Sequence, residues 1–174
     1  MNQITFDAKR IAEGYLNRPW LHKKVMEQFV KDCKITSNFQ NGLDVGCGAG
    51  LSTKALRLIC DRVTGTDISE QMIQVCQEEY KNDKAYTFYR AKAEETKAPA
   101  EKYDIVTANI LADVLVPLTP VIVNQMKPGA VYITSGIIDD KEPTVVDAVK
   151  AAGLEILEVT YQGEWVSVTA RKQA

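Results

Sequence analysis

Short apolar runs alternate with longer helix-like segments along most of this chain, and this alternation restricts the fold more than any other feature. Seven runs are predicted to be strands, at about residues 42–47, 62–67, 85–90, 103–109, 130–136, 154–161 and 164–171. Between them, helical spacing of apolar residues occurs at about 51–60, 69–82, 111–126 and 141–152. Strands that alternate with helices form a mostly parallel sheet that is covered on both faces.

The last two predicted strands break this pattern, because only the residues "QG" at 162 and 163 separate them. A connection this short joins antiparallel neighbours. The predicted fold is therefore α/β: a Rossmann-like, seven-stranded, mostly parallel sheet with helices on both faces and an antiparallel C-terminal hairpin. A nicotinamide-binding domain usually ends in further parallel crossovers instead.

Length and composition fit one ordinary globular domain, residues 1–174, with 45% hydrophobic and 25% charged residues. The net charge of -2 gives no broad attraction to nucleic acid or to an anionic membrane. The N-terminus lacks the apolar core of a signal peptide, and no apolar run approaches the ~20 residues of a membrane span. We therefore expect a cytoplasmic protein.

Metal and thiol chemistry are not indicated. The four cysteines form no C-x-x-C pair, so reduced, buried thiols are expected. His22 is the one histidine of the chain, which excludes a two-histidine metal site.

The stretch "LDVGCGAG" places an acid and three glycines between a predicted strand and a predicted helix. Counted from Gly46, the dinucleotide pattern G-x-G-x-x-G would need its third glycine at Leu51, and the G-K-[ST] ending of a phosphate loop is missing. Asp44 would repel a pyrophosphate, whereas it can bind a cationic amino group directly or through water. The loop therefore favours a zwitterionic cofactor, with a tight turn that binds nothing as the alternative.

A second acid, Asp67, ends the next predicted strand and lies 17 positions after Gly50. A carboxylate there can accept hydrogen bonds from both hydroxyls of a ribose. The alternative is that Asp67 caps the following helix, although Ser69 is the better-placed cap.

Taken together, "LDVGCGAG", "VTGTDIS" and "RAKAEE" resemble the three cofactor motifs of class I S-adenosylmethionine-dependent methyltransferases. The resemblance implies S-adenosyl-L-methionine as cofactor and S-adenosyl-L-homocysteine as product. It places the loop near the methionine and ribose part, Asp67 at the ribose hydroxyls, and three further residues around the adenine. The implied cofactor-binding residues are Asp44, Gly46, Cys47, Gly48, Gly50, Asp67, Ile68, Ala93 and Glu94.

The first half, including "FDAKRIAEGYLNRPWL", resembles small-molecule methyltransferases in which N-terminal helices close over the cofactor. This resemblance implies a helical lid over residues 1–40 and a cofactor-binding core over 41–174. Tyr15 and Arg18 become candidates for the cofactor carboxylate or the lid, with ordinary helix-surface packing as the alternative.

The second half, from "YDIVTANILADVL" to "GEWVSVTARK", is similar to the catalytic domain of the ribosomal protein L11 methyltransferases. That similarity places Asn109, Ile110 and Leu111 beside the reactive methyl group. Because the two halves resemble different branches of one superfamily, we hypothesise a recombined chain with a junction between about residues 93 and 103.

These features predict a methyltransferase whose acceptor is unidentified, either a small molecule or a protein, with an amine as one candidate. Asn109 would then accept the amine N–H bond and direct the lone pair, whereas a strand-end cap is the alternative role. Trp165 and Tyr161 are expected to pack at the hairpin, outside the site. Two other functions compete: a scaffold that binds S-adenosylmethionine without turnover, and a nicotinamide oxidoreductase, which Leu51 disfavours.

Overall fold

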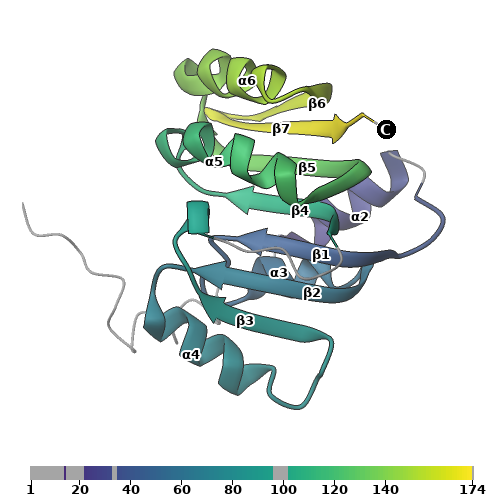
Figure 1. The fold of residues 1–174 in the computed structure, drawn as a ribbon, viewed down its shortest axis with the longest axis vertical. Coiled ribbons are helices and arrows are strands. Elements are labelled where there is room, and N and C mark those ends of the chain that lie inside the picture. Colours follow the sequence, from purple (N-terminus) through teal and green to yellow (C-terminus); the bar gives the residue numbers. More distant parts are fainter. Residues whose placement is uncertain (1–13, 15–21, 33–34, 96–101, 174) are drawn as a thin grey trace, which may run out of the picture.

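The structure is a computed structural model that describes residues 14, 22–32, 35–95 and 102–173. Its centre is a seven-stranded sheet in the order β3-β2-β1-β4-β5-β7-β6 (Figure 1). The first five strands pair in parallel, whereas β7 is antiparallel to both β5 and β6, as predicted. The strands are β1 Phe39–Val45, β2 Cys60–Asp67, β3 Tyr86–Arg90, β4 Tyr103–Asn109, β5 Met126–Ile138, β6 Leu154–Gln162 and β7 Trp165–Lys172.

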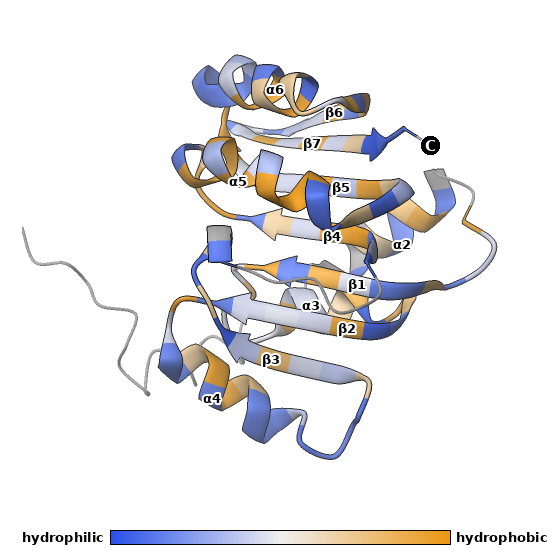
Figure 2. Cartoon of the chain, viewed as in Figure 1, coloured by the Kyte–Doolittle hydropathy of each residue, from blue (hydrophilic) through white to orange (hydrophobic). Residues whose placement is uncertain are grey.

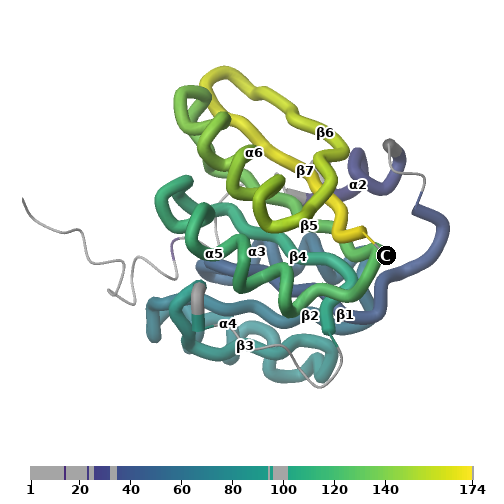
Figure 3. The backbone as a smooth tube through the Cα atoms, turned by 45° about the horizontal axis from the view of Figure 1, so that its top comes forward, coloured from purple at the N-terminus to yellow at the C-terminus, as the bar shows by residue number. Residues whose placement is uncertain are grey.

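Helices cover both faces of the sheet, which confirms the predicted class. The helices are α2 His22–Asp32, α3 Leu51–Leu56, α4 Glu70–Glu79, α5 Ala112–Gln125 and α6 Glu142–Ala151, with short 3-10 turns η1 Ala93–Glu95 and η2 Asp139–Lys141. Helices α5 and α6 lie on one face, and α2 and α3 lie on the other (Figure 1). Figure 3 follows the chain from β5 through α6 into the terminal hairpin. Of the helical lid predicted over residues 1–40, the part before residue 22 lies outside the described residues, apart from Gly14.

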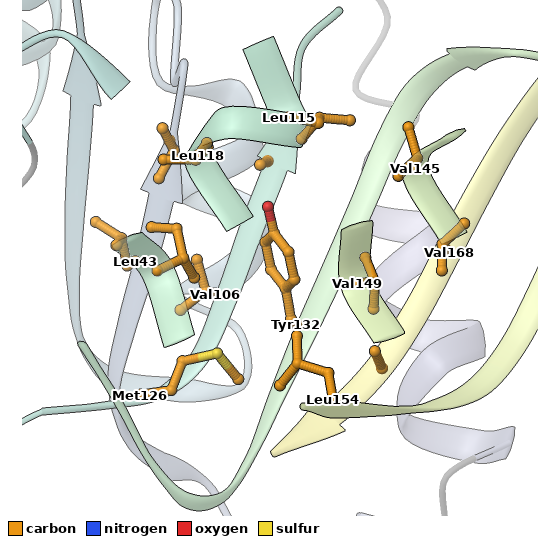
Figure 4. Packing of buried hydrophobic residues seen from close by; sticks show 14 of the residues in the cluster. Leu43, Val106, Leu115, Leu118, Met126, Tyr132, Val145, Val149, Leu154 and Val168 are labelled. Atoms are coloured by element: carbon orange, nitrogen blue, oxygen red, sulfur yellow. The ribbon is translucent and has the colours of Figure 1, made fainter. Parts of the chain in front are cut away.

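Two apolar layers hold these elements together. Hydrophobic residues run along β4, β5 and α5 (Figure 2). Between the sheet and the α5–α6 face, Tyr132 is enclosed by Leu43, Val106, Leu115 and Val149 (Figure 4). On the opposite face, a second layer joins α2 and α3 to the sheet through Met26, Leu56, Ile105 and Ile133.

The strand order creates a switch point between β1 and β4. The chain extends from β1 through β2 to β3 on one side, and from β4 to β5 on the other. In open α/β sheets, ligands bind beside such a switch point, outside the carboxyl ends of the strands. A ligand site is therefore expected beside the ends of β1 and β4, at Val45 and Asn109.

Candidate functional site

The loop after β1 has a backbone that only glycine adopts readily at three of its positions. Gly46, Gly48 and Gly50 have φ values of 74°, 52° and 87°. A Cβ atom on Gly46 would overlap the side chain of Ile110, and one on Gly50 would lie 3.0 Å from Tyr80. A Cβ on Gly48 would enter open space, so the loop presents bare backbone there, as close approach of a ligand requires.

Hydrogen bonds fix this loop to the end of β2. The N–H groups of Gly46 and Cys47 both donate to the carbonyl oxygen of Thr66, at 2.8 and 2.9 Å. The N–H of Gly48 donates to Asp67 Oδ2 at 2.9 Å. The loop and the carboxylate expected at the ribose are therefore held as one unit.

Asp67 is half-buried, and its other oxygen, Oδ1, accepts the N–H of Ser69 at 2.9 Å. Ser69 in turn caps α4, because its side chain accepts the N–H of Met72. The expectation that Ser69 is the cap is confirmed. Each carboxylate oxygen can accept more than one hydrogen bond, so Asp67 keeps capacity toward the adjoining cavity.

A cavity of about 510 Å³ lies beside Asp67 on the α5 face of the sheet. This volume falls in the usual range for small-molecule sites. Ile68 and Leu111 line it and are 61% and 67% exposed, so these large apolar side chains are available to cover a planar ring. Ala93 lines the same cavity, as expected for the adenine edge. Glu94 belongs to η1, but its side chain falls outside the described part of the chain.

Cys47 differs from the expectation, because its side chain lies beneath the loop and lines neither of the cavities described here. Its Sγ and that of Cys76 approach the carbonyl oxygen of Gly48 at 3.6 and 3.2 Å. The hydrogen bond with Cys76, together with burial, raises the pKa of the Cys47 thiol. Cys47 therefore supports the loop from below rather than facing a ligand.

A second cavity, of about 410 Å³, opens on the α2–α3 face of the sheet. Its polar lining residues are Ser52, Thr107, Asn109, Ser135, Gln162 and Ser167. Among the described residues of this lining, Asp44 is the one that carries a charge. This lining suits a neutral or cationic group better than an anion.

Asp44 is almost fully buried at this second cavity, and three hydroxyls donate to its carboxylate. Ser52 and Thr53 bond to Oδ2 at 2.6 and 2.7 Å, and Thr107 bonds to Oδ1 at 2.9 Å. The carboxylate therefore ties β1 to α3 and β4. Direct contact with a cationic amino group stays a prediction, because these hydroxyls already occupy part of the carboxylate's capacity.

The two cavities lie on either side of a corner formed by the consecutive residues Asn109 and Ile110. Asn109 is exposed and lines the second cavity, whereas Ile110 lines the first. Ile110 packs against Gly46, and the Asn109 carboxamide lies against Gly136. Within the described ranges, the Asn109 carboxamide has no hydrogen-bond partner, so it is available to a ligand.

Sequence reasoning identified Asp44 and Asn109 but missed the rest of the second cavity's lining, including Trp165 and Gly136. Trp165 lines this cavity and is 49% exposed, instead of packing outside the site. Tyr161 does lie outside both cavities, where its hydroxyl donates to Glu142 at 2.7 Å. Gly136 was missed too, although a glycine that interrupts a strand pattern is a signal for a bulge or a close approach. Tyr15 and Arg18 lie outside the described residues.

The described residues contain no group of three or more His, Cys, Asp or Glu side chains that could hold a metal ion. In the same part of the chain, no helix is long and apolar enough to cross a bilayer.

Solved structures share this fold. The ribosomal protein L11 methylase of Lactobacillus delbrueckii subsp. bulgaricus superposes with a TM-score of 0.71 at 22% identity, over 87% of this chain and 79% of that one. The N-methyltransferase NodS of Bradyrhizobium japonicum, in complex with S-adenosyl-L-homocysteine, gives 0.72 at 17% identity, over 91% and 90%.

Sequence comparison gives the family. A ribosomal protein L11 methyltransferase of Agathobacter rectalis is 45% identical over 157 residues, which are 84% of this chain and 49% of the relative. The chain thus spans about half the length of the curated relatives it matches. The family model of ribosomal protein L11 methyltransferase (PrmA) matches residues 24–173 and runs through the junction hypothesised at 93–103, so two separate ancestries receive no support. The chain therefore belongs to the ribosomal protein L11 methyltransferase (PrmA) family of S-adenosylmethionine-dependent methyltransferases.

Proposed function

We propose that this chain transfers the methyl group of S-adenosylmethionine to a nitrogen atom of ribosomal protein L11. One observation carries the proposal: two cavities open on opposite faces of the sheet and lie on either side of the Asn109–Ile110 corner. A cofactor in the first cavity and an acceptor in the second would approach each other at this corner.

The residues of the first cavity fit the cofactor. Bare backbone at Gly48 admits close approach, and Asp67 can accept ribose hydroxyls. Ile68 and Leu111 offer apolar surface for the adenine. The glycine loop, the carboxylate of Asp67 and these apolar side chains surround one cavity. An adenosine group needs this combination of polar and apolar contacts.

The residues at the corner fit transfer to nitrogen. When bound, the cofactor supplies a methyl carbon that its sulfonium activates, so a nitrogen lone pair forms the new C–N bond as the C–S bond breaks, and the amine proton passes to water. Asn109 accepts the remaining N–H bond and orients the lone pair. Trp165 and Met26 add apolar surface to the lining of the second cavity.

A protein acceptor is supported by the relatives, which bear the name ribosomal protein L11 methyltransferase. The form of the second cavity agrees, because the half-exposed Trp165 at its edge leaves it accessible from the surface. An amine at the end of a flexible segment could enter such a cavity while the rest of the protein stays outside.

The test is incubation of the chain with S-adenosylmethionine labelled in its methyl group and purified ribosomal protein L11. We expect label in the protein, and a loss of about 100-fold or more in rate for Asn109→Ala, since a misdirected amine loses most of its alignment. Asp67→Ala is expected to weaken cofactor binding at least tenfold in calorimetric titration.

The competing function, cofactor binding without turnover, predicts a clear titration with S-adenosylmethionine but no labelled product. Label that appears in a small amine or acid and not in the ribosomal protein would contradict the proposed acceptor. An Asn109→Ala variant with full activity would remove Asn109 from the mechanism.

A further inference from the structure

A bulge interrupts β5 beside the second cavity. Thr134 pairs with Val168 and Ile137 with Val166, so three steps along β5 face two steps along β7. The extra residue of β5 lies at Ser135 or Gly136, between these two pairs. Two hydrogen bonds fix the strands just before the bulge: Ser167 Oγ donates to the Thr134 carbonyl at 2.8 Å, and Thr134 Oγ1 donates to the Val168 carbonyl at 3.1 Å. Bulges of this kind re-aim side chains and end strand pairing.

Gly136 has a φ of 76°, in the left-handed region. A Cβ atom at this position would lie 2.7 Å from Asn109 Oδ1 and 3.3 and 3.4 Å from the backbone O and N of Ile110. The carboxamide therefore occupies the space that a side chain at 136 would need. Because the Ile110 backbone blocks the other direction, a Cβ could be accommodated only if the carboxamide moved.

We propose that Gly136 is a positioning residue for methyl transfer: as a left-handed glycine in the β5 bulge, it keeps open the place from which the Asn109 carboxamide faces the acceptor. This inference rests on the role of Asn109 in the proposed function. Gly136 also lines the second cavity, but its proposed effect is on the carboxamide. It acts through Asn109, whose pairing partner in the sheet, Ser135, is the other residue of the bulge.

The chain provides a matched control on the same strand. Gly129 also lies in β5 and has a φ of 78°, but a Cβ there would meet no heavy atom within 4 Å. Alanine at either position causes the same kind of backbone strain, of order 1 kcal/mol. The two substitutions differ in whether the new methyl group meets Asn109.

The experiment compares Gly136→Ala with Gly129→Ala by steady-state kinetics on ribosomal protein L11 and by calorimetric titration with S-adenosylmethionine. We expect kcat to fall roughly 10- to 100-fold in Gly136→Ala, as for a misplaced catalytic group, with the cofactor Kd changed less than about threefold. Gly129→Ala should keep kcat within about twofold. Equal loss in both variants would reduce Gly136 to a structural glycine and overturn the proposal.

A double variant tests whether the effect passes through the carboxamide. In an Asn109→Ala background, Gly136→Ala should lower kcat no further, because the obstructed group is gone. If Gly136→Ala alone unfolds, Gly136→Ala/Asn109→Ala should recover the urea midpoint of Gly129→Ala/Asn109→Ala. A further loss of kcat, or no recovery of the midpoint, would contradict coupling through Asn109.

A spectroscopic arm separates failure of this inference from failure of the proposed function. The side-chain NH2 signals of Asn109, identified by their absence in Asn109→Ala, should shift in Gly136→Ala and stay in place in Gly129→Ala. This readout needs no turnover. A chain that binds S-adenosylmethionine but methylates nothing, yet shows the shift, would refute the function and keep the positioning; signals unmoved in Gly136→Ala would refute the positioning alone.

Discussion

At the scale of single residues, Asp44 shows how a buried charge is kept in a site. Its carboxylate accepts hydrogen bonds from hydroxyls of α3 and of β4. A hydrogen bond to a charged group is worth about 1.5–3 kcal/mol, which exceeds the value of a neutral one. The three hydroxyls therefore stabilise the folded protein whether or not a ligand is bound.

Thr53→Val tests this stabilisation, because valine keeps the shape of the fully buried side chain and removes its hydrogen bond to Asp44. We expect the free energy of unfolding in urea to fall by about 1.5–3 kcal/mol. Thr119→Val is the control. Thr119 is equally buried, but its hydroxyl donates to the neutral Leu115 carbonyl, so the loss should be smaller. Equal losses would show that the Asp44 charge adds nothing.

Removing the hydroxyl group from two buried tyrosines should change the stability of the protein in opposite directions. The hydroxyl of Tyr132 is buried and makes no hydrogen bond of good geometry in the described structure, although the nearby Thr119 hydroxyl partly offsets the effect of burial on its pKa. By contrast, the hydroxyl of Tyr103 interacts with Thr64. Removing an unsatisfied buried hydroxyl relieves a desolvation cost of about 1–3 kcal/mol. Tyr132→Phe should therefore leave the urea midpoint unchanged or raise it, and Tyr103→Phe should lower it. A lower midpoint for Tyr132→Phe would be inconsistent with an unsatisfied hydroxyl.

At the scale of elements, α4 supports the cofactor loop from the side opposite the ligand. Cys76 and Tyr80 lie four residues apart on one face of the helix, and they reach the carbonyls of Gly48 and Gly50 at 3.2 and 3.4 Å. Tyr80 also stacks on Tyr86 of β3, which fixes its ring. The loop conformation thus depends on a helix that contributes no residue to the lining of either cavity.

Substitution of Cys76 tests this support. Cys76→Val removes the donor to Gly48, so we expect cofactor binding to weaken several-fold, since a lost neutral hydrogen bond is worth roughly 1 kcal/mol. Cys76→Ser keeps a donor and should bind more tightly than the valine variant. Calorimetric titration with S-adenosyl-L-homocysteine measures both. Equal Kd values for the two variants would show that the hydrogen bond is not what holds the loop.

The elements themselves were largely predictable from the sequence, because each depends on local periodicity. All seven strands were predicted, but β5 runs from 126 to 138 instead of 130 to 136, because pairing with its neighbours extends it. The bulge at Ser135 and Gly136 depends on how β5 meets β7, about 30 residues later. Likewise, the bond from Thr107 to Asp44 joins residues 63 apart, so no local pattern could show that Asp44 is already engaged.

At the scale of the whole molecule, the sheet separates the cofactor cavity from the proposed acceptor cavity. The cofactor cavity lies on the α5 face and the second cavity on the α2–α3 face. Their linings adjoin along the chain where β1 and β4 end, at the switch point of the strand order. Two glycines with positive φ, Gly46 and Gly136, make room for the chain at that junction.

The core of this sheet also sets how stability responds to alkaline pH. Burial raises the pKa of Cys60 from 9.0, and it raises the pKa of Tyr103 and Tyr132 from 10.0. The folded protein keeps these protons at pH values at which the unfolded chain releases them. Their stabilising effect is therefore complete below about pH 8 and is lost as the pH rises through 9 and 10.

We expect the free energy of unfolding in urea to be nearly constant from pH 7 to 8 and to fall steadily from pH 9 to 10.5. Each such group contributes a slope of at most about 1.4 kcal/mol per pH unit. Cys60→Ala should be less stable at every pH, because it leaves a cavity, but its decline between pH 8.5 and 10 should be shallower since one titrating group is gone. An identical slope in both proteins would mean that the unfolded thiol of Cys60 is no easier to ionise than the folded one.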